Sequence, residues 1–441
     1  MTILFLTSFA LLFIILSKYL FGKWFNHLAL YTAVWYFVIT LYEVRLMNYV
    51  EIKSTAWLVI AGSFVSFFLG SVTVYFARNS LRPASGTVPD SNRHLKLFSD
   101  GGKFVRNVII VCFVIGLFAA IQHWMVLIKM FGSIGAVLVK TNLVYRMRVD
   151  GELEGVIPYV WVVAYVGVFF SGIYTAFKNK MTFVAFLPFI AVILKEISNA
   201  SRAGMLVAFF MFISAFFLYR HIAPNKISFS RRAKLLLASA VLIGLIILSA
   251  GMVRTLRGST ESYSANSKEL NQFKSGFFIT PSLYLYLSSH VGVLSEYLEK
   301  DFDYRAKLFG ETTFQPVYNF LSKFGMVEHP KFYEKGYFIP MWTNTATYLR
   351  LLHSDFGISG IYVVPYLVGL LASFYWYRLL EKKKTLDLVL LSFLYVVIMF
   401  SSITIVTRLA SWFISLAILI IVIPFMEKTI EKKRAGLPLV N

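Results

Sequence analysis

The sequence has few charged residues and almost no cysteine. Charged side chains make up 15% of the 441 residues, against about 25% in a typical soluble domain, and hydrophobic side chains make up 58%. This composition excludes both an ordinary soluble globular protein and a disordered one. The single cysteine, Cys112, lies in an apolar run, which excludes disulfide bonds within the chain and metal sites built from several cysteines.

Motifs that bind nucleotides or metals are also missing from the sequence. No glycine-rich loop ends in Lys-Ser or Lys-Thr, so a machine driven by nucleotide hydrolysis is not indicated. No group of His, Asp and Glu residues has the spacing of metal ligands. We therefore expect no cofactor and no metal. No basic segment precedes the first apolar run at Ile3, so we interpret this run as a retained span and not as a cleaved signal peptide.

Apolar runs of about 20 residues dominate the chain, and such runs predict membrane-spanning α-helices. The predicted fold is an all-α, polytopic transmembrane helical bundle with about eleven spans. They lie at residues 2–21, 27–44, 56–77, 105–129, 156–177, 181–198, 203–220, 234–253, 356–379, 386–405 and 409–426.

Acidic residues are scarce, with 22 Asp and Glu against 43 Lys and Arg, for a net charge of +21. In a soluble protein this excess would suggest nucleic acid, but cytoplasmic loops of membrane proteins are rich in Lys and Arg, and we expect no nucleic-acid partner. Basic loops alternate with the predicted spans. This alternation places the N-terminus outside and the C-terminus in the cytoplasm; an even number of spans with both ends inside is the alternative.

Three regions follow from these spans. Residues 1–252 hold eight spans and a cytoplasmic loop at 78–103, which is rich in turn-forming and basic residues. Residues 253–355 form a large polar loop on the outer side. Residues 356–441 hold three spans and a basic cytoplasmic tail.

Arginines recur at the outer ends of the predicted spans. They are Arg202, Arg254, Arg257, Arg350 and Arg408. Several cations on one side suggest an anionic ligand at the outer leaflet; the alternative for each is a side chain that reaches lipid headgroups. Arg202 begins the seventh span, where Ser201 or Asn199 is expected to cap the helix. A guanidinium beside a free helix N-terminus suits a phosphate group.

Polar side chains concentrate just before the ninth span. Asn344, Tyr348, Arg350 and His353 recur at helical spacing on neighbouring faces. Asp355 is expected to cap the N-terminus of the span that follows. A neutral imidazole at position 353 can take a proton from a sugar hydroxyl; the alternative is a histidine tied structurally to the end of the helix.

The large outer loop has a helical part and an aromatic part. Residues 280–298 carry an apolar stripe behind a Thr-Pro-Ser start, so they are predicted to form a helix that lies on the membrane or covers a cavity. The acidic residues that follow do not have the spacing of a calcium loop, and we interpret them as a solvated helix end. They are Glu296, Glu299, Asp301 and Asp303. Aromatic residues of the loop, including Tyr337, fit an interfacial belt, with sugar stacking as the alternative.

The second half of the chain resembles the oligosaccharide repeat unit polymerases of bacterial surface polysaccharides, the Wzy-type family. The segments that carry the resemblance are Ser-Arg-Ala-Gly at 201–204, Leu-Phe-Gly-Glu-Thr-Thr-Phe-Gln-Pro-Val at 308–317, Asn-Thr-Ala-Thr at 344–347, His-Ser-Asp-Phe-Gly-Ile-Ser-Gly at 353–360, and Gly369 in the span that ends at Arg378. The arrangement of many spans with one large, late outer loop is similar too.

This resemblance implies a membrane glycosyltransferase of the GT-C-like class in the bacterial inner membrane, with its active site facing the periplasm. Such an enzyme transfers a growing glycan from undecaprenyl diphosphate onto a sugar hydroxyl of the next lipid-linked repeat unit, without metal or nucleotide, and a chain-length regulator is a potential partner. Carried onto this sequence, Arg202 comes first for binding the diphosphate, then Arg254, Arg257, Arg350 and Arg408. Asn344 and Tyr348 are candidates for contact with glycan. His353 is the candidate base, followed by Asp355.

Three other functions compete with this one. An O-antigen-type ligase uses the same donor with a different acceptor. A transporter of lipid-linked oligosaccharides would place polar residues near the membrane midplane and often contains an inverted repeat. A receptor or structural membrane protein would not require the outer arginines to meet at one cavity.

Overall fold

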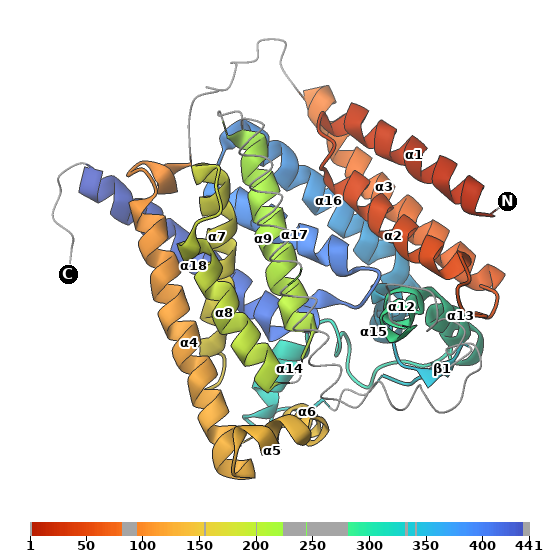
Figure 1. Ribbon diagram of the computed structural model, residues 1–441. Helices are drawn as coiled ribbons and strands as arrows, with labels where there is room; N and C mark the ends of the chain where they lie inside the picture. The colour runs from red at the N-terminus through yellow and green to blue at the C-terminus, as the bar shows by residue number, and fades with distance from the viewer. Residues whose placement is uncertain are drawn as a thin grey trace. The chain divides into compact units, whose positions relative to one another are not determined.

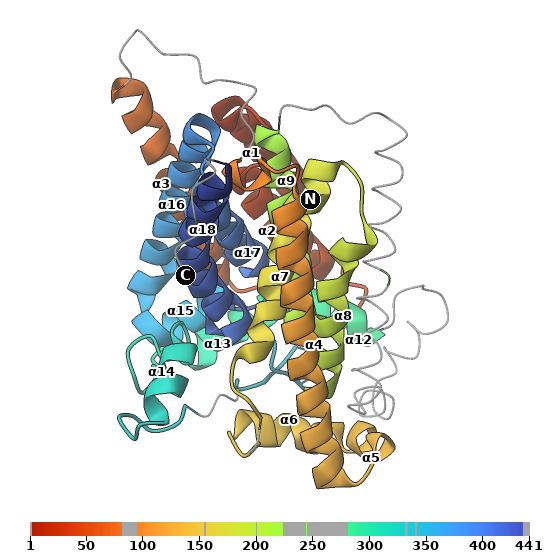
Figure 2. The same ribbon diagram turned by 90° about the vertical axis from the view of Figure 1, so that its left-hand side faces the viewer.

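A computed structural model of the chain describes residues 2–81, 95–153, 156–199, 201–223, 244, 281–330, 334–339 and 342–434. Almost all regular structure in these residues is helical, so the predicted all-α class is confirmed. The chain divides into two compact units. Figures 1 and 2 label most of the helices. Unit 1 comprises Met1–Gly86, Ser259–Phe374 and Leu394–Arg408, and unit 2 comprises Thr87–Gly258, Tyr375–Phe393 and Leu409–Asn441.

Unit 1 combines long N-terminal helices with the short helices of the predicted outer loop. Its elements are α1 (Thr2–Phe21), α2 (His27–Glu43), α3 (Ser54–Leu81), α12 (Pro281–Ser288), α13 (His290–Lys300), α14 (Gln315–Ser322), the hairpin of β1 (Tyr337–Phe338) and β2 (Trp342–Thr343), α15 (Tyr348–Phe356), most of α16 (Ile358–Lys382), the end of α17 (Thr385–Phe400) and the 3₁₀ turn η3 (Val406–Arg408). Helix α13 contacts α2, α3, α15 and β1. Helix α13 therefore packs the predicted outer loop, residues 253–355, against the long helices α2 and α3.

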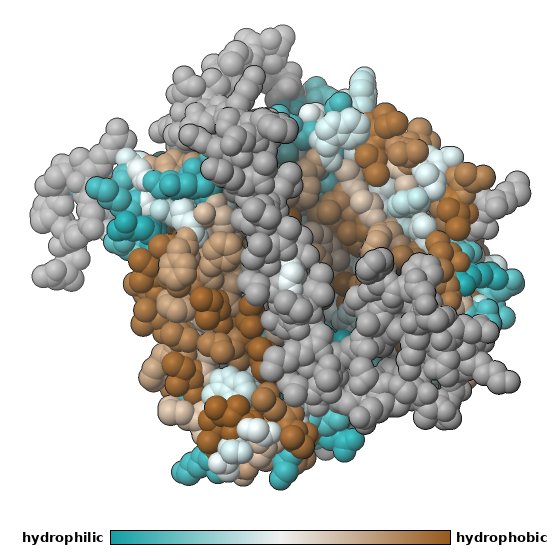
Figure 3. Space-filling view, viewed as in Figure 1, coloured by the Kyte–Doolittle hydropathy of each residue, from teal (hydrophilic) through white to brown (hydrophobic). Residues whose placement is uncertain are grey.

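Unit 2 is built around α7, which is almost completely buried. Its elements are η1 (Lys96–Phe98), α4 (Lys103–Phe131), α5 (Ile134–Val139), α6 (Thr141–Val149), η2 (Val160–Val162), α7 (Val163–Lys178), α8 (Phe183–Ser198), α9 (Ala203–Ile222), the adjoining ends of α16 and α17, and α18 (Ala410–Arg434). Helices α4, α8, α9 and α18 all contact α7. Hydrophobic side chains of α4, such as Val114 and Phe118, remain exposed on its outer face (Figure 3), as expected for a surface that faces lipid.

Seven of the described helices are long and apolar enough to cross a membrane. They are α1, α3, α4, α7 with η2, α9, α16 and α18. The chain is therefore a multi-pass membrane protein. The predicted spans at 27–44, 181–198 and 386–405 correspond to the shorter helices α2, α8 and α17, with 17, 16 and 16 residues. The predicted span at 234–253 lies, apart from Gly244, outside the described residues, so the number of eleven stays a prediction.

The structure corrects two helix caps. Asp355 does not cap the ninth span, because it lies in the last turn of a separate helix, α15, which ends at Gly357 with φ of 66°. Glycine adopts this left-handed conformation without steric cost, so the chain turns there before α16 begins at Ile358. Helix α9 begins after Arg202 and has no side-chain cap, so neither Ser201 nor Asn199 serves as one.

Two corrections concern the helical part of the outer loop. The predicted helix at 280–298 is divided at Ser289 into α12 and α13. The acidic residues at its end are not simply solvated. Glu296 is buried and pairs with Lys300 at 2.6 Å, and Glu299 accepts a hydrogen bond from Thr55.

Helices α3 and α16 approach each other backbone to backbone. A Cβ added at Gly369 would lie 2.2 Å from the carbonyl oxygen of Phe67, and one at Gly70 would lie 2.0 Å from the carbonyl oxygen of Tyr366. Small residues at such contacts allow membrane helices to pack closely. The two glycines therefore allow α16 to pack closely against α3.

Gly369→Ala is expected to lower the free energy of unfolding by about 1–3 kcal/mol, because the backbone of α3 must move to admit a methyl group. Unfolding of the detergent-solubilised protein measures this change. Gly62→Ala is the matched control on α3, since its methyl group would meet the ring of Tyr362, a half-buried side chain that can rotate. Equal losses for the two variants would contradict the backbone contact.

Candidate functional site

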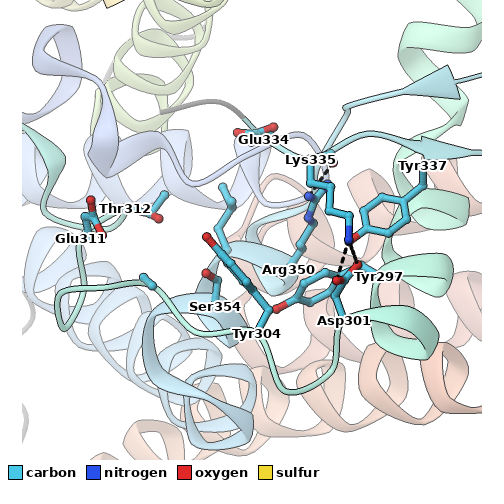
Figure 4. Close-up of a pocket in the computed structure, with 12 residues that line it drawn as sticks. Tyr297, Asp301, Tyr304, Glu311, Thr312, Glu334, Lys335, Tyr337, Arg350 and Ser354 are labelled. Atoms are coloured by element: carbon cyan, nitrogen blue, oxygen red, sulfur yellow. Dashed lines mark hydrogen bonds and ion pairs between the residues drawn. The ribbon is translucent and has the colours of Figure 1, made fainter. Parts of the chain in front are cut away.

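A pocket of about 150 Å³ lies in unit 1 beside α15 (Figure 4). Its walls come from α13, α15, the loop before α14 and the segment that enters β1. The lining residues are Tyr297, Asp301, Tyr304, Ala306, Glu311, Thr312, Glu334, Lys335, Tyr337, Arg350, Leu351 and Ser354. Tyrosines, carboxylates and cations thus share one small cavity, which suits a polar ligand with both charged and hydroxyl groups.

Arg350 is the buried cation of this pocket. Only 5% of the residue is exposed, and its guanidinium donates to the carbonyl oxygens of Thr345 at 3.2 Å and Lys335 at 2.7 Å. A guanidinium has five N–H donors, and these bonds use two of them. Within the described ranges, no carboxylate pairs with Arg350. The Asp301 carboxylate is close enough for the charge of Arg350 to help lower its pKa, but it is bound to Lys335 and Tyr337. The guanidinium is therefore placed to receive a further anionic group.

Two tyrosine rings hold the guanidinium of Arg350. Its central carbon lies 5.2 Å from the ring centre of Tyr297 and 5.0 Å from that of Tyr337. Cation–π contacts of this kind stabilise a cation by about 0.5–2 kcal/mol. The two rings and the two backbone carbonyl oxygens therefore hold the guanidinium in place, and its remaining N–H donors are available to a ligand.

Asp301 fixes one of these rings. Its carboxylate accepts hydrogen bonds from the Tyr337 hydroxyl at 2.5 Å and from the Lys335 ammonium at 2.7 and 2.9 Å. These bonds stabilise the charged carboxylate and hold the pKa of Asp301 below its usual value. Asp301 at the end of α13 is therefore an ordered part of the pocket wall.

The predicted arginine Arg408 supports the pocket from outside its lining. Its guanidinium pairs with Glu334, a lining residue, and its Nε donates to the side chain of Gln315 at 3.3 Å. The pair is largely buried, and it neutralises the charge of Glu334. Arg408 therefore does not line the pocket itself but contacts Glu334, which does.

Asp355 organises the loop that carries Glu311. Its carboxylate accepts hydrogen bonds from the backbone amides of Thr312 at 3.1 Å and Thr313 at 2.7 Å, and from the Thr313 hydroxyl at 2.7 Å. Gly310, with φ of 69°, makes the preceding turn. Asp355 therefore joins the segments 308–317 and 353–360, and its oxygens are occupied by protein donors.

His353 lies behind the pocket wall. It is fully buried, its Nδ1 is 2.9 Å from the Tyr297 hydroxyl, and its Nε2 is enclosed without a partner in the described part of the chain. Burial, and secondarily the charge of Arg305, lowers the pKa of His353 to about 4. The imidazole is therefore neutral at pH 7. It contacts the hydroxyl of the lining residue Tyr297 and does not line the pocket itself.

Acidification is expected to destabilise the protein through His353. Its pKa is about 4 when folded and about 6.5 when unfolded, so its contribution to stability is complete above pH 6.5 and declines as the pH falls towards 4. Between pH 7.5 and 5 the loss is about 2 kcal/mol. His353→Asn removes the titration but offers a polar atom to Tyr297. Its melting temperature should fall less over this interval than that of the wild type, and an equal fall would show that the buried histidine is not the cause.

The other predicted site residues lie elsewhere. Tyr348 is buried with its hydroxyl 2.8 Å from that of Tyr31 on α2, and Asn344 is exposed before α15. Neither is part of the described lining of the pocket. Arg254 and Arg257 lie outside the described residues.

Arg202 belongs to unit 2, where it stands directly before α9. The preceding helix ends in a buried ion pair, Lys195 with Glu196 at 3.4 Å. Glu196 also accepts a hydrogen bond from Tyr165 at 3.0 Å, and Gly204 leaves the space that this contact needs. The ammonium of Lys195 also lies 3.6 Å from the ring centre of Trp161 inside unit 2.

Sequence reasoning assigned several pocket residues to other roles. Tyr297 was interpreted as part of an apolar helical stripe, Asp301 as part of a solvated helix end, and Tyr337 as part of an interfacial aromatic belt. Tyr304 and Lys335 were not predicted as site residues. A signal was present in Asp-Phe-Asp-Tyr-Arg at 301–305 and Glu-Lys-Gly-Tyr at 334–337. Both stretches combine tyrosine with charged residues, as the lining of the pocket does.

In the described residues, no group of three or more His, Cys, Asp or Glu side chains is arranged to hold a metal ion. Comparison of the chain with protein-family models, with curated proteins and with solved structures found no match. The function is therefore argued from the pocket and from the sequence.

Proposed function

We propose that the protein is a Wzy-type polymerase, which joins undecaprenyl-diphosphate-linked repeat units on the outer face of a bacterial inner membrane. The observation that carries the proposal is the buried Arg350, which has unused donors and opens into a polar pocket at the beginning of the membrane helix α16. A lipid-linked substrate requires this placement, since its anionic and sugar groups lie directly above the membrane surface.

Three of the segments that carry the family resemblance support the proposal because they contribute to this pocket or to the helix beside it. Glu311 and Thr312 come from 308–317, Ser354 comes from 353–360, and Thr347 of 344–347 caps α15 through the amide of Arg350. Asp355 joins 308–317 to 353–360. In the proposed enzyme, eleven spans with the N-terminus outside form a GT-C-like fold, and residues 253–355 face the periplasm.

The proposed reaction forms one glycosidic bond and breaks one sugar–phosphate bond. The acceptor hydroxyl attacks the anomeric carbon of the donor sugar and loses its proton to a base, while undecaprenyl diphosphate leaves with the bonding electrons. The energy comes from the sugar–diphosphate bond, so no nucleotide is consumed. In the proposal Arg350 binds an anionic group of the substrate, and Arg202 remains a predicted diphosphate ligand of unit 2.

The geometry favours Glu311 as the base over the two residues that the sequence suggested. Glu311 lines the pocket and has no cationic partner in the described residues, and its carboxylate accepts a long hydrogen bond of 3.4 Å from the amide of Leu308. His353 is enclosed behind Tyr297, and the oxygens of Asp355 are occupied. Glu311 is thus free to accept a hydrogen bond from a hydroxyl group in the pocket.

The test uses purified full-length protein and an undecaprenyl-diphosphate-linked oligosaccharide, with EDTA and without nucleotide. A polymerase produces a ladder of regular steps on a gel and releases one lipid diphosphate for each bond formed. If the glycan stays unextended but moves to an added lipid A core, the protein is a ligase. If it is neither extended nor transferred but crosses a vesicle bilayer, the protein is a transporter. Either result overturns the proposal.

A further inference from the structure

The pocket has two ends of different chemistry (Figure 4). Glu311 and Thr312 lie at one end, and Asp301 with Lys335 lies at the other. Tyr304 lies between the two ends, and it is 58% exposed. A hydroxyl-rich ring could lie against the face of Tyr304 and extend towards both ends.

The charges of the lining limit what Arg350 can bind. Three carboxylates and two cationic side chains line the pocket, which leaves one net negative charge. Asp301 is paired with Lys335, and Glu334 with Arg408. The charges that remain are one positive, on Arg350, and one negative, on Glu311.

These charges disfavour a diphosphate as the occupant. A diphosphate would bring two or more negative charges into a cavity of about 150 Å³. Lys335 and Arg408 already pair with Asp301 and Glu334, so Arg350 alone would remain to neutralise those charges. A single carboxylate would neutralise Arg350 and could accept hydrogen bonds from the N–H donors of the guanidinium that the two backbone carbonyls do not use. The carboxylates and hydroxyls elsewhere in the pocket are acceptors and donors for sugar hydroxyls.

We propose that this pocket binds one sugar ring that carries a carboxylate, with the carboxylate on Arg350, the ring against Tyr304 and a hydroxyl on Glu311. The inference rests on the proposed function and names its substrate class: the polymerase joins repeat units that contain a sugar acid, recognised at this pocket. The diphosphate of the same substrate is then bound elsewhere.

The first test measures binding of monosaccharides to the detergent-solubilised full chain by saturation-transfer NMR. The probes are glucuronic acid, galacturonic acid, glucose and inorganic pyrophosphate. We expect saturable binding of at least one sugar acid, binding of glucose about tenfold weaker or more, and no displacement of the sugar acid by equimolar pyrophosphate. Equal binding of glucose and both sugar acids, no binding of either acid, or displacement by pyrophosphate would overturn the inference.

Two variants assign the binding to the pocket. Arg350→Gln should lower the affinity for the sugar acid to that for glucose and leave glucose unchanged. Tyr304→Ala removes an exposed side chain and should weaken both sugars several-fold without altering the melting temperature. If Arg350→Gln fails to fold, Tyr304→Ala still shows whether the sugar acid binds in the pocket. Unchanged binding of the sugar acid to the Tyr304→Ala protein would place the binding site outside the pocket.

Failure of this inference can be distinguished from failure of the proposed function. A ladder of products combined with no binding of a sugar acid would overturn the inference and leave the polymerase standing. Pocket-dependent binding of a sugar acid with no transfer from any lipid-linked glycan would contradict the polymerase and leave the sugar-acid site standing.

Discussion

Arg350→Gln is expected to reduce polymer formation about a hundredfold. The buried guanidinium provides charge-assisted hydrogen bonds to the substrate, each of which contributes about 1.5–3 kcal/mol, and a loss of 2.7 kcal/mol corresponds to a factor of about 100 in rate. The uncharged amide cannot replace the paired donors. The rate of appearance of the gel ladder at subsaturating substrate measures this effect.

Arg305→Gln is the matched control for this prediction. Arg305 lies between the lining residues Tyr304 and Ala306, but its guanidinium is exposed and donates to the backbone carbonyls of Phe302 and Tyr304. Its replacement should change the rate less than about threefold. A normal ladder from a folded Arg350→Gln protein, or equal losses in both variants, would show that Arg350 has no special part in the reaction.

Asp355→Ala is expected to lower the free energy of unfolding by about 3 kcal/mol or more. The substitution leaves two backbone amides without their acceptor, and each bond to a charged acceptor contributes about 1.5–3 kcal/mol. Asp355→Asn retains one carbonyl oxygen as an acceptor and should lose less. Thermal unfolding of the two variants beside the wild type measures the difference.

The same pair of variants separates structural support from acid–base chemistry. If Asp355 only positions the loop of Glu311, the Asn variant should polymerise at a substantial fraction of the wild-type rate at low temperature, where it is folded. A variant that is as stable as the wild type but inactive would contradict the structural role and identify Asp355 as a catalytic group.

The membrane-spanning helices could be predicted from the sequence because each depends on one continuous apolar segment. An apolar run of about 20 residues specifies a helix whatever its neighbours are, and ten of the predicted ranges coincide with described helices. The break between α15 and α16 is less visible. Gly357 ends a helix in this chain by adopting a positive φ, whereas the Asp-Phe-Gly pattern alone also fits a helix start.

The pocket could be predicted only in part, because it is formed by segments that lie far apart in the sequence. Arg350 was identified as a cation near the mouth of a span, and the structure places it in the pocket. His353 and Asp355 were identified as polar groups near the same helix. Their bonds to Tyr297 and to the loop at 312–313 depend on how α13 and that loop pack against α15, which no local pattern encodes. The same holds for Asp301, whose partners lie more than 30 residues away.

The most direct test of the central claim is an experimental structure of the full chain in a lipid nanodisc with a lipid-linked repeat unit. A unit whose acceptor hydroxyl is replaced by hydrogen prevents turnover. The account predicts that a sugar ring occupies the pocket between Arg350 and Glu311, with an anionic group on the edge of the guanidinium. A bound glycan in another cavity, with this pocket empty, would contradict it.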